Sequence, residues 1–368
     1  MRITCVISTL GGGGAERVMT YLCEGLAGRG HHVTLLTLDT STPDFYTLPA
    51  CVRRERIHLP PFKSVGVLGG FLRLVRMTRA LRRTRPEVVI SFMAVNVLAA
   101  ALLLRVPYIY ADHLDVRHTP FSRKWQLLRD YFLSRASRVA VLSKRDLEFI
   151  RNNHPSWKPV VIYNPALPCS HEKLPRPAFM QTDKKYVIAV GRLVAQKGFE
   201  RLLRAWYTIN SSFPQWRLAI IGAGPDEQAL RTQIAELNIS ASAALVAPIK
   251  GLQAVYQHAD LLAMSSRTEG FPMVLLEAMA AGVPVVSFNC TGPDVIVRHG
   301  VDGLLVPQDD IAAFANALAV LMKEDEKCRS LGERAREVTE RFSLSNYIDA
   351  YEGLCEDATC KKRLKSLL

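Results

Sequence analysis

Short apolar runs alternate with longer amphipathic stretches along the whole chain. The short runs predict buried parallel strands, which are apolar on both faces, and the amphipathic stretches predict helices. The expected strands are residues 3–8, 33–38, 88–91, 108–111, 139–142, 186–190, 217–221, 261–264, 283–287 and 304–306. This alternation predicts an α/β fold with helices on both faces of parallel sheets.

A proline-rich break at residues 164–183 separates two such alternations. Two domains also suit 368 residues, at about 100–200 residues per domain. We expect an N-terminal domain at 1–165, a C-terminal domain at 166–342, and a final helix at 343–368 that packs back on the first domain. Ligands bind beyond the carboxyl ends of parallel strands, so the loops there should face a cleft between the domains.

Residues 88–104 carry no charge, but Asn96 interrupts them and their first part is rich in β-branched residues. A spanning helix needs about 20 apolar residues, so a buried strand followed by a buried helix is the favoured prediction.

The first ten residues lack the features of a signal peptide. The eight cysteines form no Cys-x-x-Cys pair and no cluster with zinc spacing, which predicts a reduced, cytosolic chain.

Four glycines, residues 11–14, follow the first expected strand and open a helix. Glycines permit close approach of a ligand to the backbone, and a helix N-terminus attracts an anion. The loop fits the dinucleotide-binding fingerprint poorly, although Asp39 lies near the expected acidic position. A tight strand–helix turn explains the same residues equally well.

A second loop, residues 191–198, follows the first strand of the second domain and precedes a helix. Arg192 and Lys197 bracket it. Arginine binds phosphate oxygens through two N–H groups and lysine adds a point charge, so the pair suits a diphosphate. Two ordinary surface cations are the alternative.

The most informative stretch is residues 265–286. Pro272 suits the first position of a helix, and Gly282 suits its end. The N-terminus of this helix can hold phosphates. Glu269 stands just before it, within reach of a ligand there, and Glu277 stands eight residues later among apolar neighbours, where it can accept hydrogen bonds from a diol such as a ribose.

These segments resemble the Glu-x7-Glu motif of retaining GT-B glycosyltransferases of family 4. The same family's pattern is matched, in order, by residues 13–17 (Gly-Gly-Ala-Glu-Arg), 191–198, 292–294 and 303–307. The resemblance covers nearly the whole chain. It implies a GT-B fold, in which two doubly wound, Rossmann-like domains face a central cleft.

The resemblance also assigns roles. Arg192 and Lys197 would hold the diphosphate, Glu277 the ribose, and Glu269 the hydroxyls of the transferred sugar. His113 resembles a cleft histidine near that sugar, although a structural role in a polar loop is equally expected. The expected donor-binding set is completed by Gly13, Gly14, Gly270, Phe271, Pro272 and Met273.

A glycosyl transition state resembles an oxocarbenium ion while the leaving diphosphate gains negative charge. The chain has no Asp-x-Asp for a metal, so we expect the two cations and the helix to stabilise that charge without metal or other cofactor. The resemblance favours a UDP-sugar. Ala247 stands where the family usually has glycine, which leaves the base open, and Asp294 replaces the commoner glutamate.

The formal net charge of +13 resides in the first half, where residues 1–165 carry 24 Lys and Arg against 11 Asp and Glu. Such asymmetry predicts an anionic partner. Residues 67–85 form an amphipathic pattern with arginines at helical spacing. Such a helix suits an anionic membrane surface or the phosphates of a lipid-diphosphate acceptor; a helix with an arginine-rich solvent face is the alternative. These arginines are Arg73, Arg76, Arg79 and Arg83.

We therefore expect a retaining transferase that moves a hexose or N-acetylhexosamine from a nucleotide-diphosphate sugar to a lipid-linked or polysaccharide acceptor. The Gly-Gly-Ala-Glu-Arg opening resembles that of enzymes that build bacterial surface polysaccharide or lipid-linked oligosaccharide, which implies a cytoplasmic protein at the periphery of the inner membrane. The alternatives are a nucleotide-sugar epimerase or phosphorylase on the same plan, and a basic nucleic-acid-binding protein. No recognised module supports the last, so we expect no nucleic acid partner.

Overall fold

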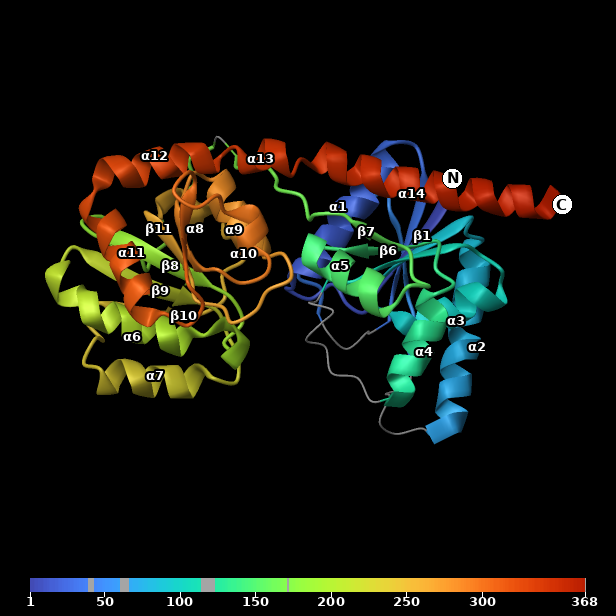
Figure 1. The fold of residues 1–368 in the computed structure, drawn as a ribbon, viewed down its shortest axis with the longest axis horizontal. Helices are drawn as coiled ribbons and strands as arrows, with labels where there is room; N and C mark the ends of the chain where they lie inside the picture. Colours follow the sequence, from blue (N-terminus) through green and yellow to red (C-terminus); the bar gives the residue numbers. More distant parts are fainter. Residues whose placement is uncertain (39–42, 60–65, 114–122, 171, 368) are drawn as a thin grey trace. The chain divides into compact units, whose positions relative to one another are not determined.

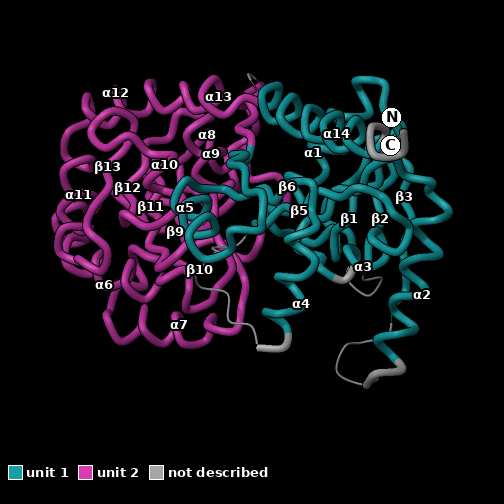
Figure 2. Tube along the Cα trace, turned by 45° about the vertical axis from the view of Figure 1, so that its right-hand side comes forward, with its two compact units in different colours: residues 1–164, 344–368 teal, residues 165–343 magenta. Residues whose placement is uncertain are grey.

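The computed structural model describes residues 1–38, 43–59, 66–113, 123–170 and 172–367. The chain forms two compact units (Figures 1 and 2). Unit 1 comprises residues 1–164 and 344–368, and unit 2 comprises residues 165–343. Each unit contains one sheet in which every strand pairing is parallel, with helices packed against it. The predicted α/β fold is confirmed.

The sheet of unit 1 has the strand order β3-β2-β1-β4-β5-β6-β7. The register places Ile3 between Val33 and Val88 on the neighbouring strands. The strand order reverses between β1 and β4, which makes the carboxyl end of these two strands the usual place for a ligand. The strands are β1 Arg2–Ile7, β2 His32–Thr37, β3 Arg53–Arg56, β4 Val88–Phe92, β5 Tyr108–Ala111, β6 Arg138–Val141 and β7 Pro159–Val161.

Two helical layers cover this sheet. The helices of unit 1 are α1 Gly14–Gly28, α2 Gly66–Thr84, α3 Val95–Leu103, α4 Arg123–Leu133, α5 Lys144–Asn153 and α14 Leu344–Leu367. Helices α2 to α5 pack against the sheet in one buried cluster. Each helix contributes to it, for example through Met77, Leu98, Leu133 and Ile150 in turn. Helix α14 contacts α1, β4 and β5. The end of the chain thus packs on the unit that holds its beginning.

The sheet of unit 2 has the order β10-β9-β8-β11-β12-β13 and reverses between β8 and β11. Its strands are β8 Lys185–Val190, β9 Trp216–Ile221, β10 Ala243–Val246, β11 Leu261–Met264, β12 Val285–Phe288 and β13 Gly303–Val306. Its helices are α6 Phe199–Ile209, α7 Glu227–Glu236, α8 Gln253–His258, α9 Met273–Ala280, α10 Pro293–Ile296, α11 Ile311–Lys323, α12 Asp325–Ala335 and α13 Val338–Arg341. Two short 3-10 turns are η2 Ala195–Lys197 and η3 Asn210–Ser212.

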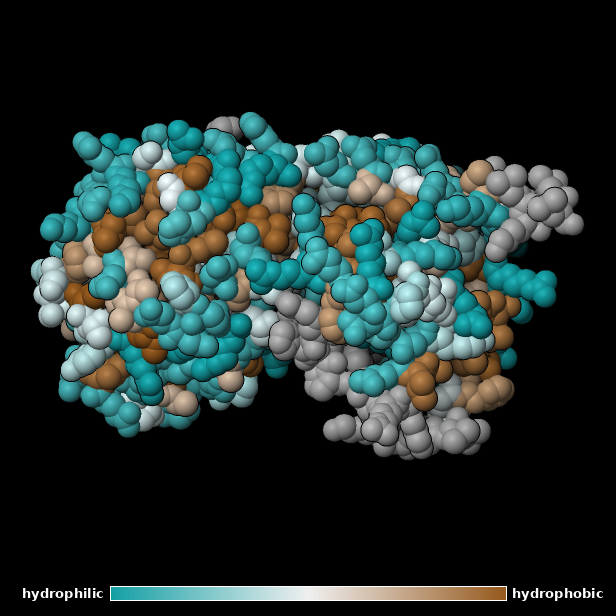
Figure 3. Space-filling view, in the orientation of Figure 1, coloured by the Kyte–Doolittle hydropathy of each residue, from teal (hydrophilic) through white to brown (hydrophobic). Residues whose placement is uncertain are grey.

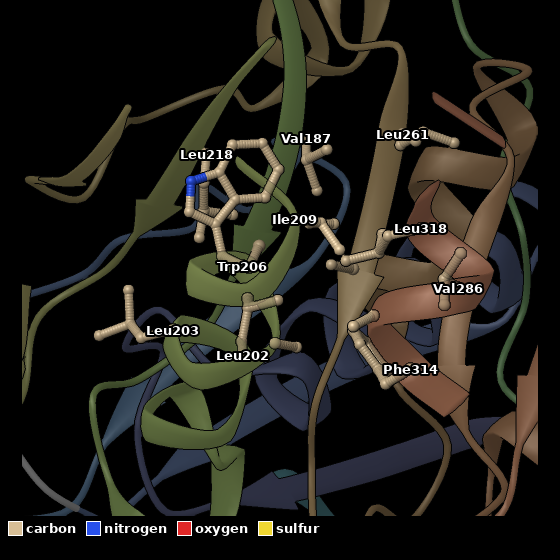
Figure 4. Packing of buried hydrophobic residues seen from close by; sticks show 14 of the residues in the cluster. Val187, Leu202, Leu203, Trp206, Ile209, Leu218, Leu261, Val286, Phe314 and Leu318 are labelled. Atoms are coloured by element: carbon tan, nitrogen blue, oxygen red, sulfur yellow. The ribbon is translucent and has the colours of Figure 1, made fainter. Parts of the chain in front are cut away.

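Large side chains fix α6 and α11 against this sheet. Figure 4 shows Trp206 of α6 beside Leu218 and Val187, with Phe314 and Leu318 of α11 in the same buried cluster. The Trp206 indole N–H donates a hydrogen bond to the Ser242 hydroxyl at 3.1 Å, so its one polar atom is satisfied. Because α6 follows the 191–198 loop directly, this packing also fixes the end of that loop.

The uncharged stretch 88–104 folds as strand β4 followed by helix α3, as its pattern predicted. Among the described residues, no helix is both long enough and apolar enough to cross a bilayer.

Candidate donor-binding site

The two loops expected to bind the donor lie side by side in unit 2. They follow β8 and β11, which are paired in parallel at the point where the strand order reverses. Several hydrogen bonds join them: the Ser265 hydroxyl donates to the Lys197 carbonyl at 2.9 Å, the Arg267 amide to the Gln196 carbonyl at 2.8 Å, and the Gln196 side-chain amide to the Thr268 carbonyl at 2.8 Å. The loops therefore form one structural element.

Glycine is required where these loops meet. Gly198 has φ +61°, and a Cβ there would lie 2.4 Å from the Ser265 carbonyl oxygen. Gly292, with φ +93°, also closely approaches the loop after β11, since a Cβ there would lie 2.8 Å from the Gly270 carbonyl oxygen. Any larger residue would separate the segments that carry the charged side chains.

Lys197 and Glu269 form the centre of the site. The Lys197 ammonium lies 2.6 Å from Glu269 Oε1, and the Ser266 hydroxyl donates to the same oxygen at 2.6 Å. Glu269 is only 7% exposed, so both interactions act in a largely desolvated setting. Glu269 Oε2 makes no hydrogen bond within the described part of the chain. It can accept one from a ligand hydroxyl beside the lysine charge.

The start of α9 adds a second source of positive potential. Helix α9 begins at Met273, one residue later than predicted, because Pro272 has an extended ψ of 115° and serves as the cap. No side chain caps this end, so first-turn N–H groups are available to an anion beside Gly270 and Phe271. The helix ends as expected, with Gly282 at φ +85°.

Arg192 extends from the loop after β8. Its side chain is exposed, and its guanidinium makes no hydrogen bond or ion pair with any residue that the structure describes. A phosphate would therefore not have to displace an existing partner from this cation.

Glu277 lies on the second turn of α9 and is half-buried. The hydroxyl of Tyr256, on α8, donates a hydrogen bond to its Oε2 at 3.0 Å. Tyr256 is itself buried, so it holds the carboxylate in one orientation. Sequence analysis did not identify this tyrosine, which lies 21 residues before Glu277 in an ordinary amphipathic stretch.

Arg201 is a further residue that sequence analysis missed. It is 6% exposed, donates to the Ser265 carbonyl at 2.5 Å, pairs with Asp309 and lies 4.5 Å over the Phe288 ring. A buried guanidinium is stable only with such partners. Arg201 thus ties the loop after β11 to α6 and to the loop after β13.

In unit 1, the glycine loop already contains an anionic group. Gly13 is the cap of α1 and Gly14 is its first residue, and a Cβ on Gly13 would lie 2.3 Å from Glu16 Oε2. The Thr9 hydroxyl donates to Glu16 Oε1 at 3.3 Å. The absence of a side chain on Gly13 accommodates this carboxylate at the positive end of the helix.

His113 follows β5 in unit 1. Its ring stacks on Phe92 with centroids 4.2 Å apart, and neither ring nitrogen has a hydrogen-bond partner among the described residues. Burial lowers the pKa of His113 to about 3. The imidazole is therefore neutral at pH 7 and can donate one hydrogen bond and accept another.

The arginines of α2 divide into two kinds. Arg76, Arg79 and Arg83 are exposed, whereas Arg73 is half-buried and desolvation lowers its pKa. Arg76 also donates to the His58 carbonyl at 2.9 Å. In the described ranges, no group of three or more His, Cys, Asp and Glu side chains has a geometry that could hold a metal ion.

Two doubly wound units, with a lysine–glutamate pair at the switch point of the second, are the arrangement expected of a GT-B glycosyltransferase. A model of glycosyl transferases group 1 matches residues 170–338, and one of glycosyltransferase family 4 matches residues 12–166. The chain belongs to this family of glycosyltransferases, which confirms the expected resemblance and enzyme class.

Among its relatives, the amylovoran biosynthesis glycosyltransferase AmsD of Erwinia amylovora is 30% identical over 335 residues, which cover 88% of this chain and 90% of AmsD. A Campylobacter jejuni transferase is 25% identical over 94% of this chain and 96% of its own; its name is GalNAc-alpha-(1->4)-GalNAc-alpha-(1->3)-diNAcBac-PP-undecaprenol alpha-1,4-N-acetyl-D-galactosaminyltransferase. The structure of Anabaena Alr3699/HepE in complex with UDP and glucose shares the fold, with a TM-score of 0.80 and 20% identity over 96% of this chain and 98% of that one.

Proposed function

We propose that this glycosyltransferase moves a hexose or N-acetylhexosamine from a UDP-sugar to a lipid-linked or polysaccharide acceptor, with retention of configuration, at the cytoplasmic face of the bacterial membrane. The names of AmsD and of the Campylobacter relative support a role in bacterial polysaccharide or lipid-linked glycan synthesis. The UDP in the Anabaena structure supports a uridine donor.

The single observation that carries this proposal is the Lys197–Glu269 pair beside the start of α9. As the bond from the sugar to the diphosphate breaks, negative charge accumulates on the leaving group. Lys197, Arg192 and the α9 N-terminus stabilise that charge. Their interaction with the diphosphate is stronger in the transition state than in the bound substrate, because the leaving group carries more negative charge there.

Glu269 binds on the sugar side of the same bond. Its Oε2 accepts a hydrogen bond from a sugar hydroxyl, while Lys197 and Ser266 hold its Oε1 in place. An imidazole with a pKa of about 3 is not a cationic acid at pH 7, so any role of His113 would be that of a neutral hydrogen-bonding group. Glu277, oriented by Tyr256, accepts from the ribose hydroxyls. We assign no protein nucleophile.

The proposal is tested with Lys197→Ala and Glu269→Ala. We expect each to lower transfer from a labelled UDP-sugar at least 100-fold, since each removes a group that acts on developing charge. Lys185 and Asp325 form a matched control, because their ammonium–carboxylate distance is also 2.6 Å and both are exposed outside the site. Lys185→Ala should keep full activity.

Wild-type turnover in either site variant, with an unchanged circular dichroism spectrum, would refute the assignment. Product analysis by mass spectrometry, with a panel of nucleotide sugars, identifies the donor. Label recovered only in an altered nucleotide sugar or in a free sugar phosphate, and never in a glycan, would favour an epimerase or a phosphorylase instead.

A further inference from the structure

Helix α4 exposes two leucines and a tyrosine to solvent while it buries an arginine. Leu127 is 72% exposed, Leu128 42% and Tyr131 48%, while Arg129, in the same two turns, is 8% exposed. Arg129 is buried with a partner, since its guanidinium lies 2.5 Å from the Asp112 carboxylate. Isolated exposed apolar residues are common, but a helix that buries an arginine and exposes two of its three leucines beside an exposed tyrosine indicates a surface that binds a partner.

These side chains form a continuous stripe along α4. Leu127 and Tyr131 are four residues apart and Leu128 lies three residues before Tyr131, so these three share one face of the helix, and Arg135 follows in the turn after α4. The Arg135 guanidinium lies 3.7 Å over the Tyr131 ring centroid. We call Leu127, Leu128, Tyr131 and Arg135 the α4 stripe. It is apolar at its start and ends in an aromatic ring with a cation on it.

Helix α2 provides a second apolar group at the same end of the unit. Phe71 is 65% exposed and Leu72 39%, both near the start of α2. Helices α2, α3 and α4 cover one face of the sheet, with α3 in contact with both others. Each begins beyond the carboxyl ends of the strands, because it leads back to the start of the next parallel strand.

The figures agree with this arrangement. Figure 1 shows α2 and α4 extending together to one end of unit 1, and Figure 2 shows the same from a second direction. In Figure 3, hydrophobic surface is interspersed with hydrophilic surface over these helices. The apolar side chains thus belong to two helices of one layer that both contact α3.

The charge around these side chains identifies the partner. Helix α2 contains five arginines and no acidic residue, and Arg76, Arg79 and Arg83 are exposed. Arg135 supplies a further exposed cation in the turn that follows α4. This combination suits an anionic bilayer. The apolar side chains and the tyrosine would enter the lipid, and the flanking arginines would bind the headgroups.

We propose that the α4 stripe, with Phe71 and Leu72, is a membrane-docking face that inserts into an anionic lipid surface. This inference rests on the proposed function, because it names the surface by which the enzyme would reach a lipid-linked acceptor. In this proposal the apolar residues of α4 insert into the lipid, whereas the arginines of α2 bind only at its charged surface.

The test uses the full chain and vesicles of phosphatidylcholine with phosphatidylglycerol. The variant Leu127→Ser/Leu128→Ser/Tyr131→Ser should lose at least tenfold in vesicle affinity, because three apolar side chains no longer leave water. Leu103→Ser/Tyr207→Ser is the matched control: both residues are as exposed, at 63% and 53%, but lie outside the α4 stripe. It should bind like the wild type.

A second measurement does not depend on the triple variant being folded. Leu127→Trp should show fluorescence quenching by brominated lipid, whereas Leu103→Trp should not. Binding should weaken as salt is raised and be weaker to pure phosphatidylcholine, because the arginine contribution is electrostatic.

Three outcomes would overturn the inference: no binding of the wild-type protein to anionic vesicles, wild-type binding by the triple variant, or Leu127→Trp fluorescence that brominated lipid does not quench. Self-association that the triple variant abolishes, without vesicle binding, would instead assign the face to a second copy of the chain. Transfer to a water-soluble acceptor is measured in parallel. If it fails while vesicle binding holds, the proposed function is wrong and the docking face stands.

Discussion

At the scale of single residues, the site depends on one carboxylate oxygen that two neighbours hold. Glu269 Oε1 accepts from Lys197 and Ser266, each at 2.6 Å, so its position is fixed before a substrate arrives. Such fixed dipoles need little reorganisation during the reaction. On the proposed function, this geometry predicts that a carboxylate is needed at 269 and a small hydroxyl residue at 266.

Glu269→Gln separates the charge of this residue from its shape. The amide is of similar size, but it no longer neutralises Lys197. We expect kcat to fall about 100-fold or more, as when a transition-state contact is lost, while KM for the donor changes little because Lys197 keeps its charge for the phosphates. Steady-state kinetics with a purified donor give both constants. An unchanged kcat would contradict the role assigned to this carboxylate.

The low pKa of His113 predicts how stability depends on pH. Histidine in the unfolded chain has a pKa of about 6.5, whereas the pKa of folded His113 is about 3. Between these values the unfolded chain binds the additional proton, so this residue lowers the free energy of unfolding as the pH falls through that window.

His113→Phe should therefore lose less stability than the wild type between pH 7 and pH 5, as measured by urea denaturation. His32→Phe, at an exposed histidine, is the control and should behave as the wild type does. Equal pH dependence in all three proteins would show that folded His113 takes up protons as freely as unfolded histidine.

At the scale of elements, the longer apolar runs predicted strands correctly, whereas the short strands β7 and β10 and the charged strand β3 were missed. The predicted runs at 108–111 and 261–264 match β5 and β11 to the residue. Strand β3 was missed because its sequence is Arg-Arg-Glu-Arg, which has no apolar face. It forms at the edge of the sheet, where its side chains remain partly in water and only its backbone is needed for pairing.

The site shows the same division. Sequence motifs identified Lys197 and Glu269, because the residue types and their places beside glycines and a helix start carry the chemistry. They did not show that the two side chains pair with each other, nor that Ser266, Tyr256 and Arg201 support them. Tyr256 and Arg201 come from other elements, brought together by the parallel sheet, whereas Ser266 lies in the same loop as Glu269; as single residues all three are ordinary polar side chains.

Arg201 allows a test of how the loops are held. Arg201→Lys keeps the charge but cannot satisfy the Ser265 carbonyl and Asp309 together. Loss of one charged hydrogen bond corresponds to about tenfold in an equilibrium constant, so we expect KM for the donor to rise by about that factor. Arg231→Lys, at an exposed pair on α7, is the control. The role of Arg201 is refuted if both variants keep wild-type KM values.

At the scale of the whole molecule, charge and chemistry are distributed differently between the two units. The net charge of +13 comes from residues 1–165, whereas the Lys197–Glu269 pair lies in unit 2. Unit 1 contains His113, the glycine loop and the proposed membrane-docking face. This division suits an enzyme that binds its soluble donor through one unit and a surface-bound acceptor through the other, although this assignment of roles to the units stays a prediction.

The central claim is that the donor diphosphate binds at the junction of Lys197, Arg192 and the start of α9. The most direct measurement is a crystal structure of the protein with UDP. We predict that the diphosphate oxygens lie within hydrogen-bonding distance of both side chains and of first-turn N–H groups of α9, with the ribose at Glu277. Nucleotide bound elsewhere, with Lys197 still paired only to Glu269, would contradict the account.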